Sequence, residues 1–144
     1  MAEALKWRDA VKVVRGKSLD GAMQQANSGG RATAFEFSGA GGRETWIGTV
    51  TLQPDGNTGP HHHGRHEVAL YVASGRSEIR WGDRLEYAAD AGPGDLVYFA
   101  PYVPHQERNP SPGEAVIFLV VRSDNERIAV PVAMEPVDRS QMQT

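Results

Sequence analysis

The stretch His61-His62-His63-Gly64-Arg65-His66-Glu67 lies near the middle of the chain and decides how the rest of the sequence is interpreted. The fifth and last histidine, His105, lies in Val103-Pro104-His105-Gln106-Glu107-Arg108-Asn109. Residues typical of β-strands surround both stretches. On a strand, residues i and i+2 point to the same face, so His61 and His63 are able to bind one ion together. Neutral imidazole is the commonest metal ligand in proteins, so the two stretches predict a metal site.

The composition of the chain is that of a globular protein and excludes several classes of function. Its 144 residues suit one domain with a real core, and the net charge of −3 comes without any long Lys/Arg run. We therefore expect no nucleic-acid partner. The absence of cysteine excludes disulfides, cysteine-ligated zinc, iron–sulfur clusters and a thiol nucleophile. The first residues lack an apolar signal core and no apolar run reaches bilayer length, so we expect a cytoplasmic protein without a membrane partner.

From residue 32 onward the pattern is that of many short strands separated by glycine and proline. The absence of a long helical period favours an antiparallel sandwich or barrel over a parallel α/β sheet, so we predict an all-β fold. The expected strands cover residues 32–37, 45–52, 68–73, 77–81, 85–89, 96–100, 105–108, 115–121 and 128–132.

The two ends of the chain differ from this pattern. Residues 11–15 alternate and predict a short peripheral strand, and residues 18–27 predict a short helix with Ser18 at its N-cap. We therefore expect an N-terminal strand and helix extension over residues 1–30, packed on a barrel over residues 31–135. Residues 136–144 predict a polar, frayed tail.

Two motifs resemble those of the cupin superfamily. The stretch His61-x-His63-x3-Glu67, followed by Gly75, is similar to the first cupin motif, and Gly94-x10-His105-x3-Asn109 is similar to the second. The resemblance is close over residues 56–109 and looser in the other strands, and it points to the small single-domain cupin-2 type. It implies a double-stranded β-helix, or jelly-roll, barrel. It also implies one divalent metal ion bound by two histidines and a glutamate of the first motif and one histidine of the second.

Carried onto this chain, the resemblance implies the metal ligands His61, His63, Glu67 and His105. His62 points the opposite way on a strand, and His66 does not match the parity of His61 and His63, so neither is expected to be a ligand.

The chain departs from the usual motifs in three places. The spacing from Glu67 to Gly75 is one residue longer than common, and Gly56 is one residue too close to His61. Ala100 and Tyr102 stand where the second motif has proline and glycine. The longer spacing resembles pirin-like cupins, in which a carboxylate two residues after the second-motif histidine is a ligand. That residue is Glu107, which shares a strand face with His105. The sequence leaves both carboxylates open and favours Glu67.

Imidazoles and one carboxylate suit Fe, Mn, Ni, Co or Zn, and three or four protein ligands leave coordination positions open for a substrate. We therefore expect a metal-dependent enzyme acting on a small molecule, an oxygenase first and an isomerase or lyase next. The alternatives are a non-catalytic binding or sensing cupin and a barrel whose metal is purely structural. The resemblance also implies a homodimer.

Overall fold

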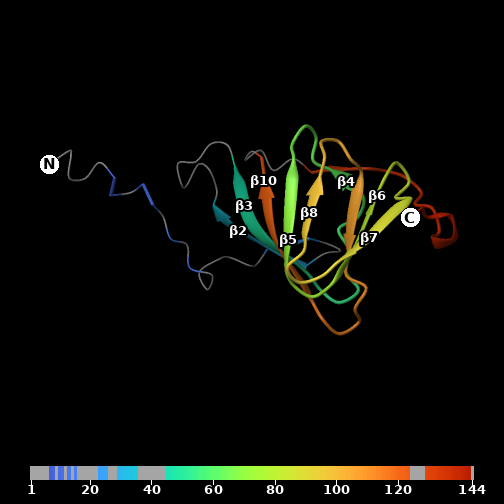
Figure 1. Ribbon diagram of the computed structural model, residues 1–144, viewed down its shortest axis with the longest axis horizontal. Helices are drawn as coiled ribbons and strands as arrows, with labels where there is room; N and C mark the ends of the chain where they lie inside the picture. Colours follow the sequence, from blue (N-terminus) through green and yellow to red (C-terminus); the bar gives the residue numbers. More distant parts are fainter. Residues whose placement is uncertain are drawn as a thin grey trace.

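The computed structural model describes residues 7–8, 10–11, 13, 15, 23–25, 29–35, 45–123 and 129–143. Over these residues the chain is almost entirely β-structure (Figure 1). The one described helix is a 3-10 turn, η2 (Arg139–Gln141). No helix among the described residues is long and apolar enough to cross a lipid bilayer. The strands are β1 (Met23–Gln25), β2 (Gly29–Phe35), β3 (Trp46–Leu52), β4 (His61–His62), β5 (Val68–Ser74), β6 (Ser77–Trp81), β7 (Tyr87–Ala91), β8 (Leu96–Phe99), β9 (His105–Arg108), β10 (Val116–Arg122) and β11 (Val130–Pro131).

These strands form two antiparallel sheets. The first, sheet A, has the order β1-β2-β3-β10-β5-β8, and the second, sheet B, has the order β11-β4-β9-β6-β7. Strands that are distant in sequence lie side by side in both sheets, as β3 and β10 do in Figure 1. This is the jelly-roll arrangement, so the predicted all-β double-stranded β-helix is confirmed.

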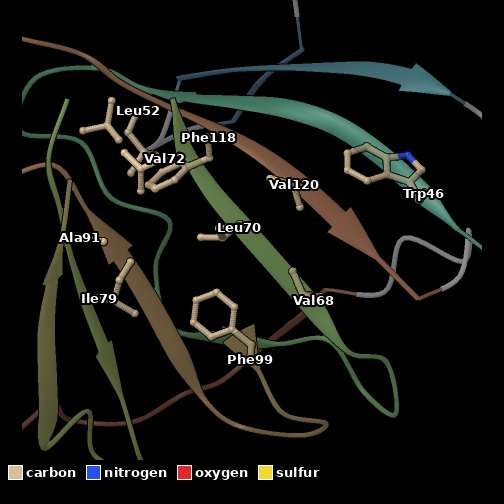
Figure 2. Close-up of a cluster of buried hydrophobic side chains, with 11 residues drawn as sticks. Trp46, Leu52, Val68, Leu70, Val72, Ile79, Ala91, Phe99, Phe118 and Val120 are labelled. Carbon is tan, nitrogen blue, oxygen red and sulfur yellow. The ribbon is translucent and has the colours of Figure 1, made fainter. Parts of the chain in front are cut away.

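The core lies between the inner faces of the two sheets. Along β10, Val116, Phe118 and Val120 are buried while Ile117 is exposed, which is the period-2 alternation of a strand with one face on a core. Figure 2 shows Ile79 of sheet B directed toward the side chains of sheet A. Each fully buried aliphatic or aromatic side chain stabilises the fold by about 1.5–3 kcal/mol relative to an exposed one. The core holds Trp46, Leu52, Val68, Leu70, Val72, Ile79, Ala91, Phe99, Val116, Phe118 and Val120.

The predicted N-terminal helix is wrong over its described part. Within residues 18–27 the structure describes Met23–Gln25, which form β1 and pair with β2 through Met23↔Arg31 and Gln25↔Gly29. A helix of ten residues is marginal on its own, so backbone pairing with a neighbouring strand prevails. The rest of that segment lies outside the described residues. Residues 12 and 14 of the predicted strand 11–15 also lie outside the described residues. Residues 11, 13 and 15 are described; they are exposed and not in a strand.

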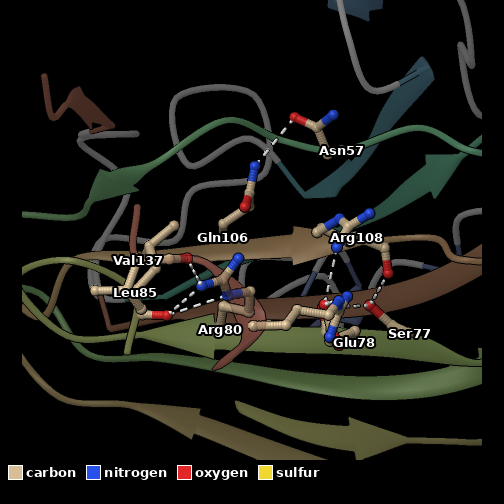
Figure 3. Close-up of polar contacts among 9 residues, drawn as sticks. Asn57, Ser77, Glu78, Arg80, Leu85, Gln106, Arg108 and Val137 are labelled. Atoms are coloured by element: carbon tan, nitrogen blue, oxygen red, sulfur yellow. Dashed lines mark hydrogen bonds and ion pairs between the residues drawn. The ribbon is translucent and has the colours of Figure 1, made fainter. Parts of the chain in front are cut away.

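The C-terminal segment, predicted to be frayed, is held against sheet B through Gln143. The Gln143 N–H donates to the Glu86 carbonyl at 2.6 Å, and Val137 is buried. The Arg80 guanidinium donates to the carbonyls of Val137 at 3.0 Å and Leu85 at 2.7 Å (Figure 3). A buried cation thus satisfies two carbonyl groups at once, which ties the tail to the strand β6.

Glu78 on β6 connects the same tail to β9. Its carboxylate accepts a hydrogen bond from Arg108 at 3.0 Å (Figure 3). It also accepts two from Arg139, at 2.8 and 2.9 Å. The hydrogen bond from Arg139 lowers the pKa of Glu78, and with the nearby Arg108 charge it outweighs partial burial, which raises the pKa.

We predict that Glu78→Gln destabilises the protein by about 1 kcal/mol at pH 7. A carboxylate whose folded pKa lies below its unfolded value of about 4.3 stabilises the fold above that value, and this stabilisation is lost as the pH falls through the folded pKa. The difference between wild type and variant should therefore be full above about pH 5.5 and shrink below about pH 4. Chemical denaturation across this range measures it, with the exposed Glu114→Gln as control. A difference that is constant with pH would contradict the role of the ion pairs.

Candidate metal centre

The backbone pairing of β4 with β9 brings the two histidine stretches together. His61 and His105 are directly opposite in the antiparallel register, and their ring centroids are 4.4 Å apart. His63 follows β4, and its ring lies 4.9 Å from that of His61 and 5.0 Å from that of His105. One ring nitrogen from each of the three histidines lies within 4.8 Å of the others. The structure thus brings together all three histidines that the sequence singled out.

A hydrogen bond between two turns joins the two histidine stretches. The Tyr102 N–H donates to the Gly64 carbonyl at 2.8 Å, so the turn before His105 is tied to the turn after His63. Tyr102 has a φ of +64° and occupies the place where the second motif carries glycine. The left-handed conformation costs a non-glycine residue about 1–2 kcal/mol, which the surrounding hydrogen bonds offset.

Backbone carbonyls orient two of the imidazole rings. His61 Nδ1 lies 2.9 Å from the Gly59 carbonyl, and His105 Nδ1 lies 3.0 Å from the Val103 carbonyl. A carbonyl only accepts, so in each ring Nδ1 carries the proton and Nε2 keeps its lone pair. This is how most metal-binding histidines are held by their second nitrogen. The Phe99 ring stacks on His105 at 3.9 Å and further limits the rotation of that imidazole.

The environment of His105 fits a metal ion. Its side chain has no exposed surface, and its Nε2 atom has no hydrogen-bond partner among the described residues. Burial lowers the pKa of His105, against the smaller opposing effect of the Glu107 charge, and so favours the neutral form that binds metals. A buried nitrogen without a hydrogen-bond partner is costly in a folded protein unless something binds it. A metal ion bound by the three histidines would satisfy this atom.

Glu107 is the carboxylate that lies beside the histidines. One of its oxygens is 3.7 Å from His105 Nε2 and the other is 4.0 Å from His61 Nε2. Thr58 Oγ1 donates to the carboxylate at 2.8 Å and accepts from the Glu107 N–H at 3.1 Å. Burial raises the pKa of Glu107, but the neighbouring imidazoles of His105 and His61 and the hydrogen bond from Thr58 outweigh it, so the pKa is lowered. An ionised carboxylate beside the three nitrogens completes a donor set suited to a divalent cation.

Glu67, the carboxylate that the sequence favoured, lies outside this cluster of three histidines. Its side chain is exposed and accepts a hydrogen bond from the Tyr98 hydroxyl. The physical reason is strand parity, because Val68 and Leu70 of β5 point into the core and line the cavity. The residue before Val68 therefore points to the opposite face. The geometry favours the pirin-like alternative, Glu107.

The two remaining histidines are not part of the cluster. His62 Nδ1 accepts a hydrogen bond from the Gly64 N–H at 2.9 Å, and the His62 ring lies 6.0 Å from that of Tyr102. His66 is buried, and its N–H donates to the His63 carbonyl at 3.3 Å.

A cavity of about 470 Å³ adjoins the histidines. One wall belongs to sheet B and carries the polar groups His61, His63 and Glu107. The opposite wall belongs to sheet A and is apolar except for one arginine. Its side chains are Val50, Val68, Leu70, Phe118, Val120 and Arg122. A cavity of this size, apolar with a few convergent polar groups, is typical of small-molecule sites.

Fold and site together define a jelly-roll barrel with a candidate metal centre beside its cavity. The family model described as the cupin domain matches residues 48–122, which is more than half of the chain. The chain belongs to the cupin family. A comparison of the sequence with curated proteins found no match.

Solved structures share the jelly-roll fold of this chain. The polyketide cyclase RemF from Streptomyces resistomycificus has a TM-score of 0.73 and 20% identity, covering 87% of each chain. A double-stranded β-helix protein from Klebsiella pneumoniae has a TM-score of 0.68 and 16% identity, covering 86% of this chain and 99% of its own. Oxalate decarboxylase from Bacillus subtilis has a TM-score of 0.67 and 17% identity, covering 85% of this chain and 33% of its own. At these identities the likeness shows the fold alone.

Sequence reasoning missed two polar residues of the site. Thr58 lies in the loop before His61, and nothing in its local sequence marks it. Arg122 ends β10, and its position could have been found, because Phe118 and Val120 define an inward row whose next member is residue 122.

We predict that His61→Ala, His63→Ala and His105→Ala each remove most of the metal that co-purifies with the protein. The reason is that one ion needs all three nitrogens at once. Metal per chain after dialysis, determined by elemental analysis, measures the effect. His62→Ala is the matched control, because it removes an adjacent histidine outside the cluster. Equal losses in His62→Ala and His61→Ala would refute the assignment.

We also predict that Glu107→Gln weakens metal affinity by about tenfold or more, while Glu67→Gln leaves it within about twofold. Glu107 lies against two of the candidate ligands, whereas Glu67 is on the outer face of sheet A. Competition with a metal-sensitive dye gives both affinities. The opposite order would return Glu67 to the ligand set.

Proposed function

We propose that this cupin is a metal-dependent enzyme that carries out proton transfer on a small molecule bound in the cavity. The observation that supports this most is the arrangement of His61 and His105, whose Nδ1 atoms are held by backbone carbonyls while both Nε2 atoms lie close to the Glu107 carboxylate. His63 supplies the third nitrogen. We infer the ligand set His61, His63 and His105, with Glu107 as the adjoining carboxylate.

A divalent ion held there would supply a Lewis acid for a carbonyl or carboxylate oxygen of the substrate. The other parts of the reaction belong to the chain. Glu107 is the one carboxylate among the described residues that line the cavity, and it is placed either to complete the ligand set or to accept a proton from the substrate. The Thr58 hydroxyl holds this carboxylate in one orientation. The apolar wall of sheet A excludes water from the substrate.

Proton transfer next to a polarised carbonyl group is the basis of isomerisation, elimination and cyclisation. It therefore corresponds to the isomerase or lyase expectation from the sequence rather than to the oxygenase. Among the solved structures, RemF is described as a polyketide cyclase. That description concerns RemF, and it supports the proposal only in showing that this fold hosts a cyclisation reaction.

The proposal is tested in two steps. Protein purified without added metal should contain about one divalent ion per chain. In D₂O it should then exchange the C3 hydrogens of the 2-oxo acid 4-methyl-2-oxopentanoate faster than buffer does, as followed by proton NMR. Glu107→Gln should lower this rate by at least about a hundredfold, which is the usual size of a general-base contribution.

Other outcomes would support other functions. A metal-loaded protein without exchange would favour a binding or sensing cupin, and oxygen uptake with an iron-loaded sample would restore the oxygenase. A barrel that loses its fold when a chelator removes the metal, and shows no exchange, would favour a structural ion. The homodimer expected from the family resemblance remains a prediction that light scattering would test.

A further inference from the structure

Arg122 is the one arginine or lysine among the described residues that line the cavity. It ends β10, and its side chain is only 4% exposed. On β10 it follows Phe118 and Val120 in the inward row, so the three side chains lie along one wall at intervals of about 7 Å. The cavity therefore has a permanent positive charge on sheet A and the histidine cluster with Glu107 on sheet B.

Trp46 packs against this guanidinium. Trp46 and Arg122 are register partners between β3 and β10, and the centre of the guanidinium lies 4.9 Å from the centroid of the indole ring. Figure 2 shows Trp46 at the end of the core cluster on the side of Val120 and Val68. An arginine stacked on an aromatic face keeps its N–H groups directed sideways, in its own plane. A guanidinium has five N–H donors, so it is able to bind a ligand's carboxylate alongside a second contact.

The other buried arginine provides a contrast. Arg80 is 7% exposed and directs its donors at the backbone carbonyls of Leu85 and Val137, which join two segments of the chain. Arg80 does not line the cavity. These contacts give Arg80 a structural role. Arg122 instead borders a space large enough for a small organic molecule, with Val68 beside it on β5 and Val120 before it on β10.

We propose that Arg122 binds the anionic group of the substrate, and that the substrate class is a small carboxylic acid with a compact apolar body. This proposal rests on the proposed function, in which the reacting group at the other end of the substrate meets the histidine cluster. The apolar body lies against Val50, Leu70, Phe118 and Val120. Bidentate pairing with a carboxylate in a site of low dielectric constant is the interaction for which arginine is best suited. Discrimination against an uncharged analogue follows, because only the acid forms the ion pair.

The test compares an acid with its uncharged amide, 4-methylpentanoate and 4-methylpentanamide. Affinities are measured by NMR titration of the full chain at pH 8, where unperturbed histidines are neutral. One series uses the protein as purified and a second follows chelator treatment, because a carboxylate also binds metal ions directly. In both series the acid should bind at least about tenfold more tightly than the amide. The indole N–H signal of Trp46 should shift on binding of the acid.

Variants distinguish the contribution of Arg122 from a general effect of positive charge on binding. After chelator treatment, Arg122→Gln should bring the two affinities within about twofold, and Arg122→Lys should retain part of the preference. Arg76→Gln removes an exposed arginine outside the cavity and should retain all of it. If Arg122→Gln does not fold, the wild-type comparison and the Trp46 signal decide. Equal binding of acid and amide by the chelator-treated protein, a preference that survives Arg122→Gln after chelator treatment, or an unmoved Trp46 signal would each overturn the proposal.

The two proposals fail separately. A protein without metal that still prefers the acid after chelator treatment would refute the metal-dependent function and support the role of Arg122. A protein that holds one metal ion per chain but binds acid and amide equally after chelator treatment would refute the role of Arg122 and support the metal-dependent function.

Discussion

The antiparallel register between β4 and β9 is the constraint on which the candidate site depends. It places His61 directly opposite His105, and opposed residues on one face of an antiparallel pair have Cβ atoms only about 4.5–5.5 Å apart. A slip by one residue would turn every side chain of β4 to the other face and disperse the three histidines. Trp81 is the partner of His105 on the other side, so β6 fixes β9 in the same register. The geometry of the candidate metal centre is thus a consequence of main-chain hydrogen bonding.

Buried polar side chains stabilise this register from outside the site. The Asn109 amide donates to the carbonyls of Leu52 at 3.1 Å, Gln53 at 3.1 Å and Glu114 at 2.6 Å, which closes the loop directly after β9. Gly75 serves a similar purpose between β5 and β6, because a Cβ there would lie 2.4 Å from the Ala115 carbonyl oxygen. Asn109 and Gly75 belong to the two motifs, yet neither contacts the histidine cluster. Their roles are to hold β9 and the β5–β6 connection in place.

Strand parity explains which features the sequence predicted and which it did not. The alternation of short strands predicted the barrel, and the spacing of His61 and His63 predicted their common face. To choose between Glu67 and Glu107 one needs to know which residues of β5 point into the barrel. Val68, Leu70 and Val72 are inward, so Glu67 is outward, and the family spacing alone did not reveal this. The helix predicted over residues 18–27 failed because local propensity cannot anticipate pairing with β2.

The two walls of the cavity come from different sheets. The candidate metal ligands lie on or next to strands of sheet B, while the apolar wall and Arg122 lie on sheet A. Substitutions on sheet A can therefore alter the shape and charge of the cavity without disturbing the pairing of β4 with β9. In evolutionary terms, such a barrel is able to change the shape and charge of its cavity while keeping the histidine cluster. An engineer would vary Val50, Phe118 and Arg122 first and leave sheet B unchanged.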